Sequence, residues 1–266
     1  MKNIKLYISI ISFAAIALIS SCAVFFYKNI PMAGTCPSDT SSESSSNLIK
    51  DGDKLPVLMY HHVDDKDFDD RYYYVKPTSF YEQMKYLYDN EYTTLTFNEV
   101  KDYKRYKKPV LITFDDGYND NYLNAYPVLK GFNMKATVFL IAQFIDKPEY
   151  LSKSNISKMK DVVSFQSHTN CHSNLKELDN DLIEKECIES KKIIENITGK
   201  SVIAISYPFG MYNQSVIDIA KRHYTYGITG DNGYLDHGNG TFTIKRIPVT
   251  YNETLNDFKK KFSFAN

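Results

Sequence analysis

The chain has 266 residues, of which 43% are hydrophobic and 24% charged, so it allows one folded domain of enzyme size plus an appendage. Lys and Arg together number 32, as do Asp and Glu, and the formal net charge is therefore zero. Because nucleic-acid-binding proteins usually carry a basic excess, this balance argues against nucleic acid as the main partner. The four cysteines show no metal-binding spacing and no disulfide framework.

The first 27 residues are predicted to be a membrane segment outside the fold. Lys2 and Lys5 precede the uncharged stretch 6–27, which as a helix is long enough to cross a bilayer. We favour an uncleaved signal anchor. A lipoprotein signal is an alternative, because the residues before Cys22 resemble a lipobox, and a cleaved signal peptide is a third. Each places the remaining chain outside the cytoplasm, at the extracellular face of the membrane or secreted.

Residues 28–54 are Ser-rich and polar, and they are too poor in apolar side chains to order themselves. We expect a flexible linker that holds a domain, residues 55–266, away from the membrane.

Short apolar runs alternate with amphipathic stretches from residue 55 onward. Several runs are almost continuously apolar, which is typical of parallel strands buried on both faces. Alternation of strands and helices predicts an α/β fold with a parallel sheet. Seven or eight strands in roughly 210 residues fit a closed or nearly closed barrel. The expected strands are 56–60, 92–97, 109–114, 135–141, 161–167, 202–207, 224–229 and 243–249.

Three amphipathic stretches are expected to be helices. The first, 77–90, has apolar residues at helical spacing and a cap at Thr78 or Ser79. The others cover 174–200, ending at Gly199, and 213–223.

Polar residues suited to chemistry follow three of these strands. The carboxyl ends of parallel strands form the active-site face of such folds, so these side chains are expected to meet on one face. They are His61 and His62, Asp115 and Asp116, and His168 and His172.

A metal ion explains the two adjacent aspartates. The four-residue separation of His168 and His172 predicts both rings on one side of a helical turn, within reach of one ion. Two imidazoles and one carboxylate leave an open position for water, as in catalytic zinc sites. Asp116 is the expected third ligand, and the cation then lets Asp115 stay ionised beside it.

Three short motifs carry a resemblance to a known family. TFDDGY (113–118), SHTNCH (167–172) and YPFG (207–210) resemble the first three motifs of the polysaccharide deacetylases. The resemblance covers roughly residues 55–250 and implies a distorted (β/α) barrel and metal-dependent removal of N- or O-acetyl groups from sugars. PVLMYHHV near the start of the domain and KRIPV near its end look like the extracellular deacetylases of poly-β-1,6-N-acetylglucosamine.

The resemblance also implies roles for single residues. Asp116, His168 and His172 would hold the metal, most simply Zn²⁺, although Co²⁺, Ni²⁺ and Mn²⁺ also suit such a site. Asp115 would act as general base, and His61, rather than His62, as general acid in place of a C-terminal histidine. The backbone N–H of Phe209, next to Pro208, would bind the oxyanion.

The chain departs from the family pattern at two points. Ser206 stands where classical members have the arginine that steadies the base, and the Trp of a later motif is missing. Arg246 is a candidate for the missing positive charge, with an ordinary ion pair as the equal alternative. We interpret the tyrosine cluster RYYYV (71–75) as loop residues rather than a substrate groove.

The sequence therefore predicts an enzyme that removes N-acetyl groups from N-acetylglucosamine units of an extracellular, biofilm-type polysaccharide. Peptidoglycan N-acetylglucosamine and acetylated xylan are alternative substrates. A barrel that binds polysaccharide without cleaving it is the alternative of another class. The expected partners are the polysaccharide and, through the N-terminal segment, the membrane.

Overall fold

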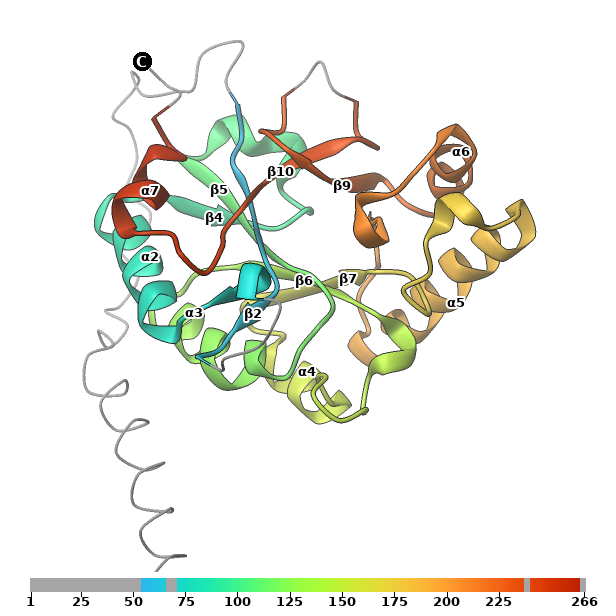
Figure 1. Cartoon of the computed structure of the whole chain (residues 1–266), viewed down its shortest axis with the longest axis horizontal. Helices are drawn as coiled ribbons and strands as arrows, with labels where there is room; N and C mark the ends of the chain where they lie inside the picture. The colour runs from blue at the N-terminus through green and yellow to red at the C-terminus, as the bar shows by residue number, and fades with distance from the viewer. Residues whose placement is uncertain (1–53, 66–70, 237–239, 264–266) are drawn as a thin grey trace, which may run out of the picture. The chain divides into compact units, whose positions relative to one another are not determined.

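The computed structural model describes residues 54–65, 71–236 and 240–263 (Figure 1). The expected membrane segment, 1–27, and all but the last residue of the expected linker, 28–54, lie outside these residues, so the division of the chain stays a prediction. Within the described residues, no helix is both long and apolar enough to cross a membrane.

Seven parallel strands close into a barrel. The ring closes because β1 (Val57–Tyr60) pairs with β10 (Ile244–Pro248) on one side and with β5 (Pro109–Phe114) on the other. An eighth strand, β4 (Thr93–Leu95), pairs with the first half of β5 and is not part of the ring. The predicted barrel of about seven strands is confirmed. Between β10 and β5 the ring continues through β9 (Tyr226–Asn232), β8 (Ala204–Ser206), β7 (Val163–Ser167) and β6 (Ala136–Leu140).

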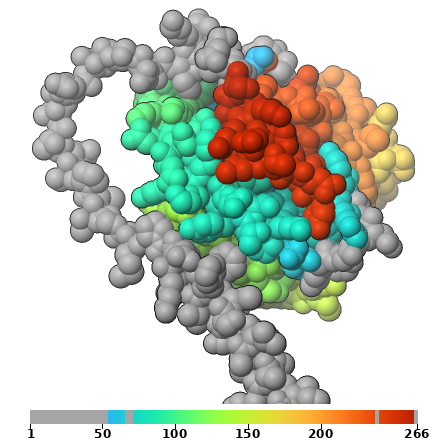
Figure 2. Space-filling view, turned by 60° about the vertical axis from the view of Figure 1, so that its left-hand side comes forward, coloured from blue at the N-terminus to red at the C-terminus, as the bar shows by residue number. Residues whose placement is uncertain are grey.

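Helices lie around the outside of the strands (Figure 1). In Figure 2 the C-terminal segment, which includes α7, lies on the surface beside α2, and the rings of Tyr86 and Phe258 contact each other with centroids 6.2 Å apart. The helices are α2 (Pro77–Asp89), α3 (Tyr126–Gly131), α4 (Lys153–Met159), α5 (Asn180–Thr198), α6 (Gln214–His223) and α7 (Leu255–Lys260). Short turns of 3₁₀-helix cover Arg71–Tyr73, Val100–Arg105, Ala142–Phe144, Leu175–Glu177 and Pro208–Gly210, a π-helical turn covers Asn121–Ala125, and β2 (His62–Val63) pairs with β3 (Tyr74–Val75).

One expected helix cap and one expected helix start are wrong, whereas the first helix begins at residue 77 as predicted. Helix α2 begins at Pro77 with Lys76 as N-cap, because proline has no N–H to satisfy and suits the first helical position, so neither Thr78 nor Ser79 caps it. Helix α5 begins at Asn180 rather than near residue 174, since the Asp179 side chain accepts from the backbone N–H of Leu182. Its predicted end is confirmed by Gly199, which is left-handed with φ 67°.

Alternate residues of each strand build two cores. Because strand side chains alternate, one set fills the barrel and the other packs under the helices. On β5, Leu111 belongs to the inner cluster, whereas Val110 and Ile112 belong to the outer one. Continuing that alternation past the last layer of apolar residues brings Thr113 and Asp115 to the inside, at the carboxyl end of the barrel.

A side chain bridges the gap between β7 and β8. These strands share only one pair, Ser167 with Ile205. Gln166, which is 2% exposed, supplies the missing acceptor, because its Oε1 accepts from the backbone N–H of Ile203 at 2.8 Å and of Ala204 at 2.9 Å. A buried amide therefore helps to keep the barrel closed between β7 and β8.

We predict that Gln166→Leu lowers the free energy of unfolding by about 1 to 3 kcal/mol, because it leaves two backbone donors without an acceptor. Urea denaturation of the purified protein measures this loss. Gln143→Leu changes an exposed glutamine in the same way and should stay within about 0.5 kcal/mol. An equal effect of the two changes would contradict the bridging role of Gln166.

Candidate active site

The polar residues that follow the strands gather in one cavity at the carboxyl ends of the barrel. Its volume is about 730 Å³, which suits one or two sugar units. The residues that the sequence singled out and that line it are His61, His62, Asp115, Asp116, His168, His172, Phe209 and Arg246.

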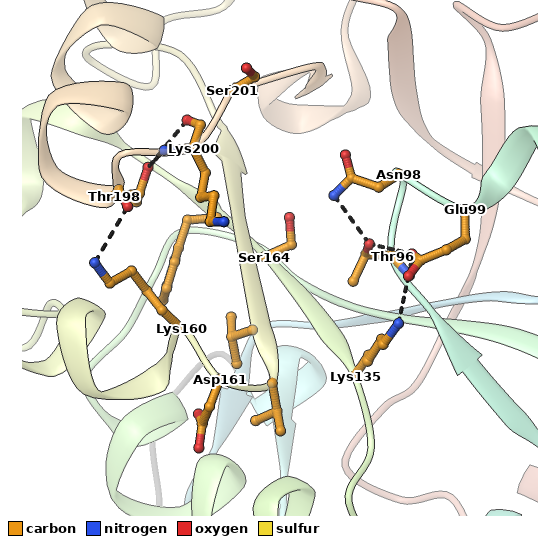
Figure 3. A pocket seen from close by; sticks show the side chains of 13 residues that line it. Thr96, Asn98, Glu99, Lys135, Lys160, Asp161, Ser164, Thr198, Lys200 and Ser201 are labelled. Atoms are coloured by element: carbon orange, nitrogen blue, oxygen red, sulfur yellow. Dashed lines mark hydrogen bonds and ion pairs between the residues drawn. The ribbon is translucent and has the colours of Figure 1, made fainter. Parts of the chain in front are cut away.

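A smaller cavity of about 480 Å³ lies near the amino ends of β6 and β7. Figure 3 shows that its polar side chains largely bond to one another; Lys135 pairs with Glu99, for example, and Lys160 donates to the Thr198 carbonyl. None of the candidate site residues lines it.

Asp116, His168 and His172 form a group able to hold a metal ion, with one potential ligand atom from each lying within 4.8 Å of the others. The Asp116 Oδ1 atom lies 3.3 Å from Nε2 of His168 and 3.4 Å from Nε2 of His172. This oxygen is buried and accepts no hydrogen bond within the described part of the chain. An orphaned buried carboxylate oxygen facing two imidazole nitrogens fits a divalent cation.

The surroundings of His168 suit a ligand as well. Its Nδ1 lies 2.8 Å from the carbonyl oxygen of Ser206, an acceptor, so Nδ1 carries a proton and Nε2 is the nitrogen directed to Asp116. Burial lowers the pKa of His172 to about 4, with the charge of His168 adding to the effect, so this ring is neutral at neutral pH. Burial lowers the pKa of His168, but the charges of Asp115 and Asp116 outweigh burial and raise it, so a bound cation would replace the proton on Nε2.

The two histidines do not lie on a helical turn, which corrects the sequence-based expectation. Residues 168–172 form an irregular loop, and Thr169 and His172 adopt left-handed conformations with φ 64° and 61°. The loop folds back so that the rings meet with centroids 4.9 Å apart. A four-residue separation brings the rings together here through a bend rather than through helical periodicity.

Asp115 is clamped by Arg246. The guanidinium reaches across the barrel from β10 and donates to both carboxylate oxygens, with Nη1–Oδ1 2.7 Å and Nη2–Oδ2 2.6 Å. The Arg246 and Asp115 side chains are 2% and 4% exposed. Ser206 completes the cluster, donating to Asp115 at 3.2 Å and accepting from Arg246 at 3.1 Å.

This clamp keeps Asp115 ionised. Burial raises the pKa of Asp115, but the charges of Arg246 and His168 outweigh it and hold the pKa well below its usual range. At neutral pH the cavity therefore contains a carboxylate that can accept a proton.

His61 belongs to the same electrostatic cluster. Burial lowers its pKa, and the charges of Asp115 and Asp116 offset part of that effect. His62 has a different environment, since its Nδ1 lies 2.6 Å from Asp120 and its ring stacks between Tyr74 and Tyr118.

The turn after β8 presents Phe209 to the cavity. Phe209 has φ 58°, its side chain is 65% exposed, and its ring centroid lies 4.6 Å from that of His172. Pro208 is buried and starts the turn, but it does not line the cavity.

A match to known proteins covers most of this architecture. The polysaccharide deacetylase family model matches residues 102–227. YxkH of Bacillus subtilis (strain 168), provisionally named a polysaccharide deacetylase, is 38% identical over 204 residues, which are 74% of this chain and 72% of YxkH. This chain belongs to the polysaccharide deacetylase family.

Two further similar proteins are relevant to the site. Poly-beta-1,6-N-acetyl-D-glucosamine N-deacetylase of Staphylococcus aureus (strain N315) is 25% identical over 282 aligned positions, covering 94% of each chain. The solved structure of Streptococcus pyogenes deacetylase PplD in complex with acetate is 31% identical with a TM-score of 0.75, covering 79% of this chain and 98% of that one.

Sequence reasoning missed part of this deacetylase cavity. Tyr72, Tyr73 and Tyr74 line it, so their interpretation as plain loop residues is wrong. The pairing of β3 with β2 sets them beside the histidines, and the Tyr73 ring centroid lies 4.6 Å from that of His61. Tyr118 lines it too, although its place two residues after Asp116 was the only signal in the sequence.

We predict that Arg246→Met lowers the free energy of unfolding of the deacetylase by about 3 to 5 kcal/mol, because it leaves the buried Asp115 carboxylate without its cation. Urea denaturation measures the loss, and the double variant with Asp115→Asn should recover part of it. Arg222→Met removes an exposed pair with Glu184 and should cost at most about 1 kcal/mol. Similar costs at positions 246 and 222 would refute the clamp.

We predict that Zn²⁺ in 100-fold excess over its Kd raises the Tm of chelator-treated protein by about 5 to 10 °C, since binding at that excess adds about 2.7 kcal/mol. Asp116→Asn should remove most of this rise while preserving the fold, because Asn tolerates the left-handed backbone, φ 70°, at this position. Thermal denaturation with and without Zn²⁺ measures both. Asp218→Asn, at an exposed site, is the control, and a full Zn²⁺ response in Asp116→Asn contradicts the assignment.

Proposed function

We propose that this polysaccharide deacetylase hydrolyses N-acetyl groups from N-acetylglucosamine units of an extracellular polysaccharide of the poly-β-1,6 type. The main support is that the Asp115 carboxylate, held by Arg246, lies in the same cavity as the possible metal ligands Asp116, His168 and His172. The choice of polysaccharide is supported by the similarity to the Staphylococcus aureus N-deacetylase along 94% of both chains.

Asp116, His168 and His172 are the proposed ligands of a divalent metal, with Zn²⁺ the simplest choice for two nitrogens and one oxygen. When bound there, such an ion would polarise the acetyl carbonyl and lower the pKa of a water molecule. Tyr118 also lines this cavity, and its phenol pKa is raised by burial and by the Asp116 charge, so it stays protonated and able to donate.

Asp115 is the proposed general base. It takes a proton from the water whose oxygen attacks the acetyl carbonyl carbon. Arg246 holds both oxygens of this carboxylate, so the carboxylate cannot rotate away, and Ser206 fixes the same oxygen that Arg246 Nη2 binds. Arg246 therefore orients the base, as the arginine of classical members does from a different strand.

The oxyanion and the leaving group need two further donors. The backbone N–H of Phe209 is the proposed oxyanion donor, and its left-handed turn presents that residue at the cavity wall beside His172. His61 is the proposed general acid. It donates a proton to the amide nitrogen as the C–N bond breaks, so that the sugar leaves as an amine and the acetyl group as acetate.

The proposed place of action is the extracellular face of the membrane. The support is the apolar stretch 6–27 behind Lys2 and Lys5, together with a relative that acts on poly-β-1,6-N-acetylglucosamine.

Acetate release tests the substrate. The purified full chain, kept soluble in detergent because of its apolar segment 6–27, is incubated with Zn²⁺ and one of three substrates. These are β-1,6-linked N-acetylglucosamine oligomers, β-1,4-linked N-acetylglucosamine of peptidoglycan type, and acetylated xylan. We expect the highest kcat/KM on the β-1,6 oligomers. A higher kcat/KM on another substrate would assign that polysaccharide as the substrate instead. No release of acetate from any of the three would contradict the hydrolase and favour a protein that only binds polysaccharide.

We predict that Asp115→Asn lowers kcat on the preferred substrate about 10²- to 10⁴-fold, which is the usual contribution of a general base. Its Zn²⁺ content should match that of the unsubstituted protein, since Asp115 is not a proposed ligand. Kinetics and metal analysis of the same preparation measure both. Asp218→Asn is again the exposed control, and a variant at 115 that keeps more than a tenth of the activity would overturn the role.

A further inference from the structure

The loop between the two histidines is held in a conformation that is costly by itself. Thr169 and His172, both left-handed, each place a Cβ close to a following carbonyl oxygen, at a cost of about 1 to 2 kcal/mol per residue. Such conformations persist only where surrounding contacts hold the backbone in place. The hydrogen bonds of the loop show which contacts these are.

Every backbone N–H from His168 to His172 has an acceptor. The first is the Leu140 carbonyl, and two others are hydroxyls, since Ser167 Oγ accepts from Thr169 and Thr169 Oγ1 accepts from His172. The remaining two, from Asn170 and Cys171, both donate to one carboxylate oxygen from a distant part of the chain.

That carboxylate is Glu186, on helix α5. Its Oε2 accepts from Asn170 N at 2.8 Å and from Cys171 N at 2.9 Å, and the residue is 9% exposed. No ion pair to Glu186 is found within residues 54–65, 71–236 and 240–263, and the two N–H groups join its carboxylate directly to the backbone of the loop. Hydrogen bonds to an ionised acceptor are roughly twice as strong as neutral ones.

Glu186 is one of several α5 side chains that form hydrogen bonds with this loop or with Ser167 just before it. Ser190, one helical turn further on and therefore on the same face, has its hydroxyl 2.7 Å from that of Ser167. Glu189 accepts a hydrogen bond from the Asn170 side chain at 2.8 Å, and its other carboxylate oxygen lies 3.9 Å from Nζ of Lys185. Of these contacts, the Glu186 contact alone acts on the backbone midway between the two imidazoles.

We propose that Glu186 is a positioning residue of the metal centre, whose carboxylate sets the separation and direction of the His168 and His172 imidazoles by fixing the two peptide groups between them. This rests on the proposed metal site of the deacetylase. Partners of metal-binding side chains outside the ligand set commonly change metal affinity when they are lost. Through Glu186, helix α5 thereby affects how well the irregular loop 168–172 places its two imidazoles around an ion.

Metal affinity tests the proposal without reference to activity. The full chain and its variants are titrated with Zn²⁺ against a chromophoric chelator, and the visible absorption of the Co²⁺-loaded proteins is recorded, because it reports the geometry around the ion. We expect Glu186→Ala to weaken Zn²⁺ binding about tenfold or more and to change the Co²⁺ spectrum. Glu186→Gln, which keeps one oxygen acceptor, should bind with intermediate affinity and a spectrum nearer to that of the unsubstituted chain.

Two controls separate this role from general stability. Glu189→Ala removes a neighbouring carboxylate that touches no loop backbone, and Ile194→Ala creates a cavity further along α5, where Ile194 is fully buried. Both should keep Zn²⁺ affinity within about threefold and an unchanged Co²⁺ spectrum, although Ile194→Ala lowers the Tm of the metal-free protein.

The outcomes divide cleanly. Unchanged affinity and spectrum in the Glu186 variants overturn the proposal, as does an equal loss in either control. Where Glu186→Ala does not fold, Glu186→Gln decides by the same two measurements. Failure of the unsubstituted chain to bind Zn²⁺ or Co²⁺ overturns the metal site itself, whereas binding that ignores Glu186 overturns only the positioning role.

Discussion

The ion pair between Arg246 and Asp115 is the interaction on which the rest of the cavity depends. Both side chains are almost fully buried, and desolvating them is favourable only because two hydrogen bonds join them and Ser206 meets both. The pair links β10 to β5 at the carboxyl end of the barrel. It also lets Asp115 remain a carboxylate one residue away from Asp116, where two like charges would otherwise raise each other's pKa.

Four residues at or beside the cavity have left-handed backbone. Asp116, Thr169, His172 and Phe209 all have φ between 58° and 70°, a region that residues other than glycine seldom adopt. Asp116 and His172 are proposed metal ligands, Phe209 is the proposed oxyanion donor, and Thr169 follows the proposed ligand His168. The barrel and α5 hold these conformations, so the stability of the rest of the fold offsets the free energy that the strained backbone costs.

The departure of this deacetylase from its family pattern has a simple geometric explanation. In a barrel, side chains from several strands point into the same layer, so a charge can be supplied from any of them. Ser206 is small enough to leave room, and the guanidinium of Arg246 fills that room from β10. Asp115 therefore keeps a contact to arginine although the position that resembles the family's arginine site holds Ser206.

From the sequence alone, the alternation of almost continuous apolar runs with amphipathic stretches, together with the number of runs, predicted the α/β barrel. The residues after each run indicated which side chains would meet, because strand ends in parallel folds converge. Sequence could not decide how they meet. The bend that joins His168 to His172, the reach of Arg246 across the barrel, the tyrosines brought in by β3 and the hold of Glu186 on the loop join residues between 4 and 131 positions apart. Such contacts depend on side-chain packing and on left-handed backbone that no local pattern encodes, and only the tertiary structure selects them.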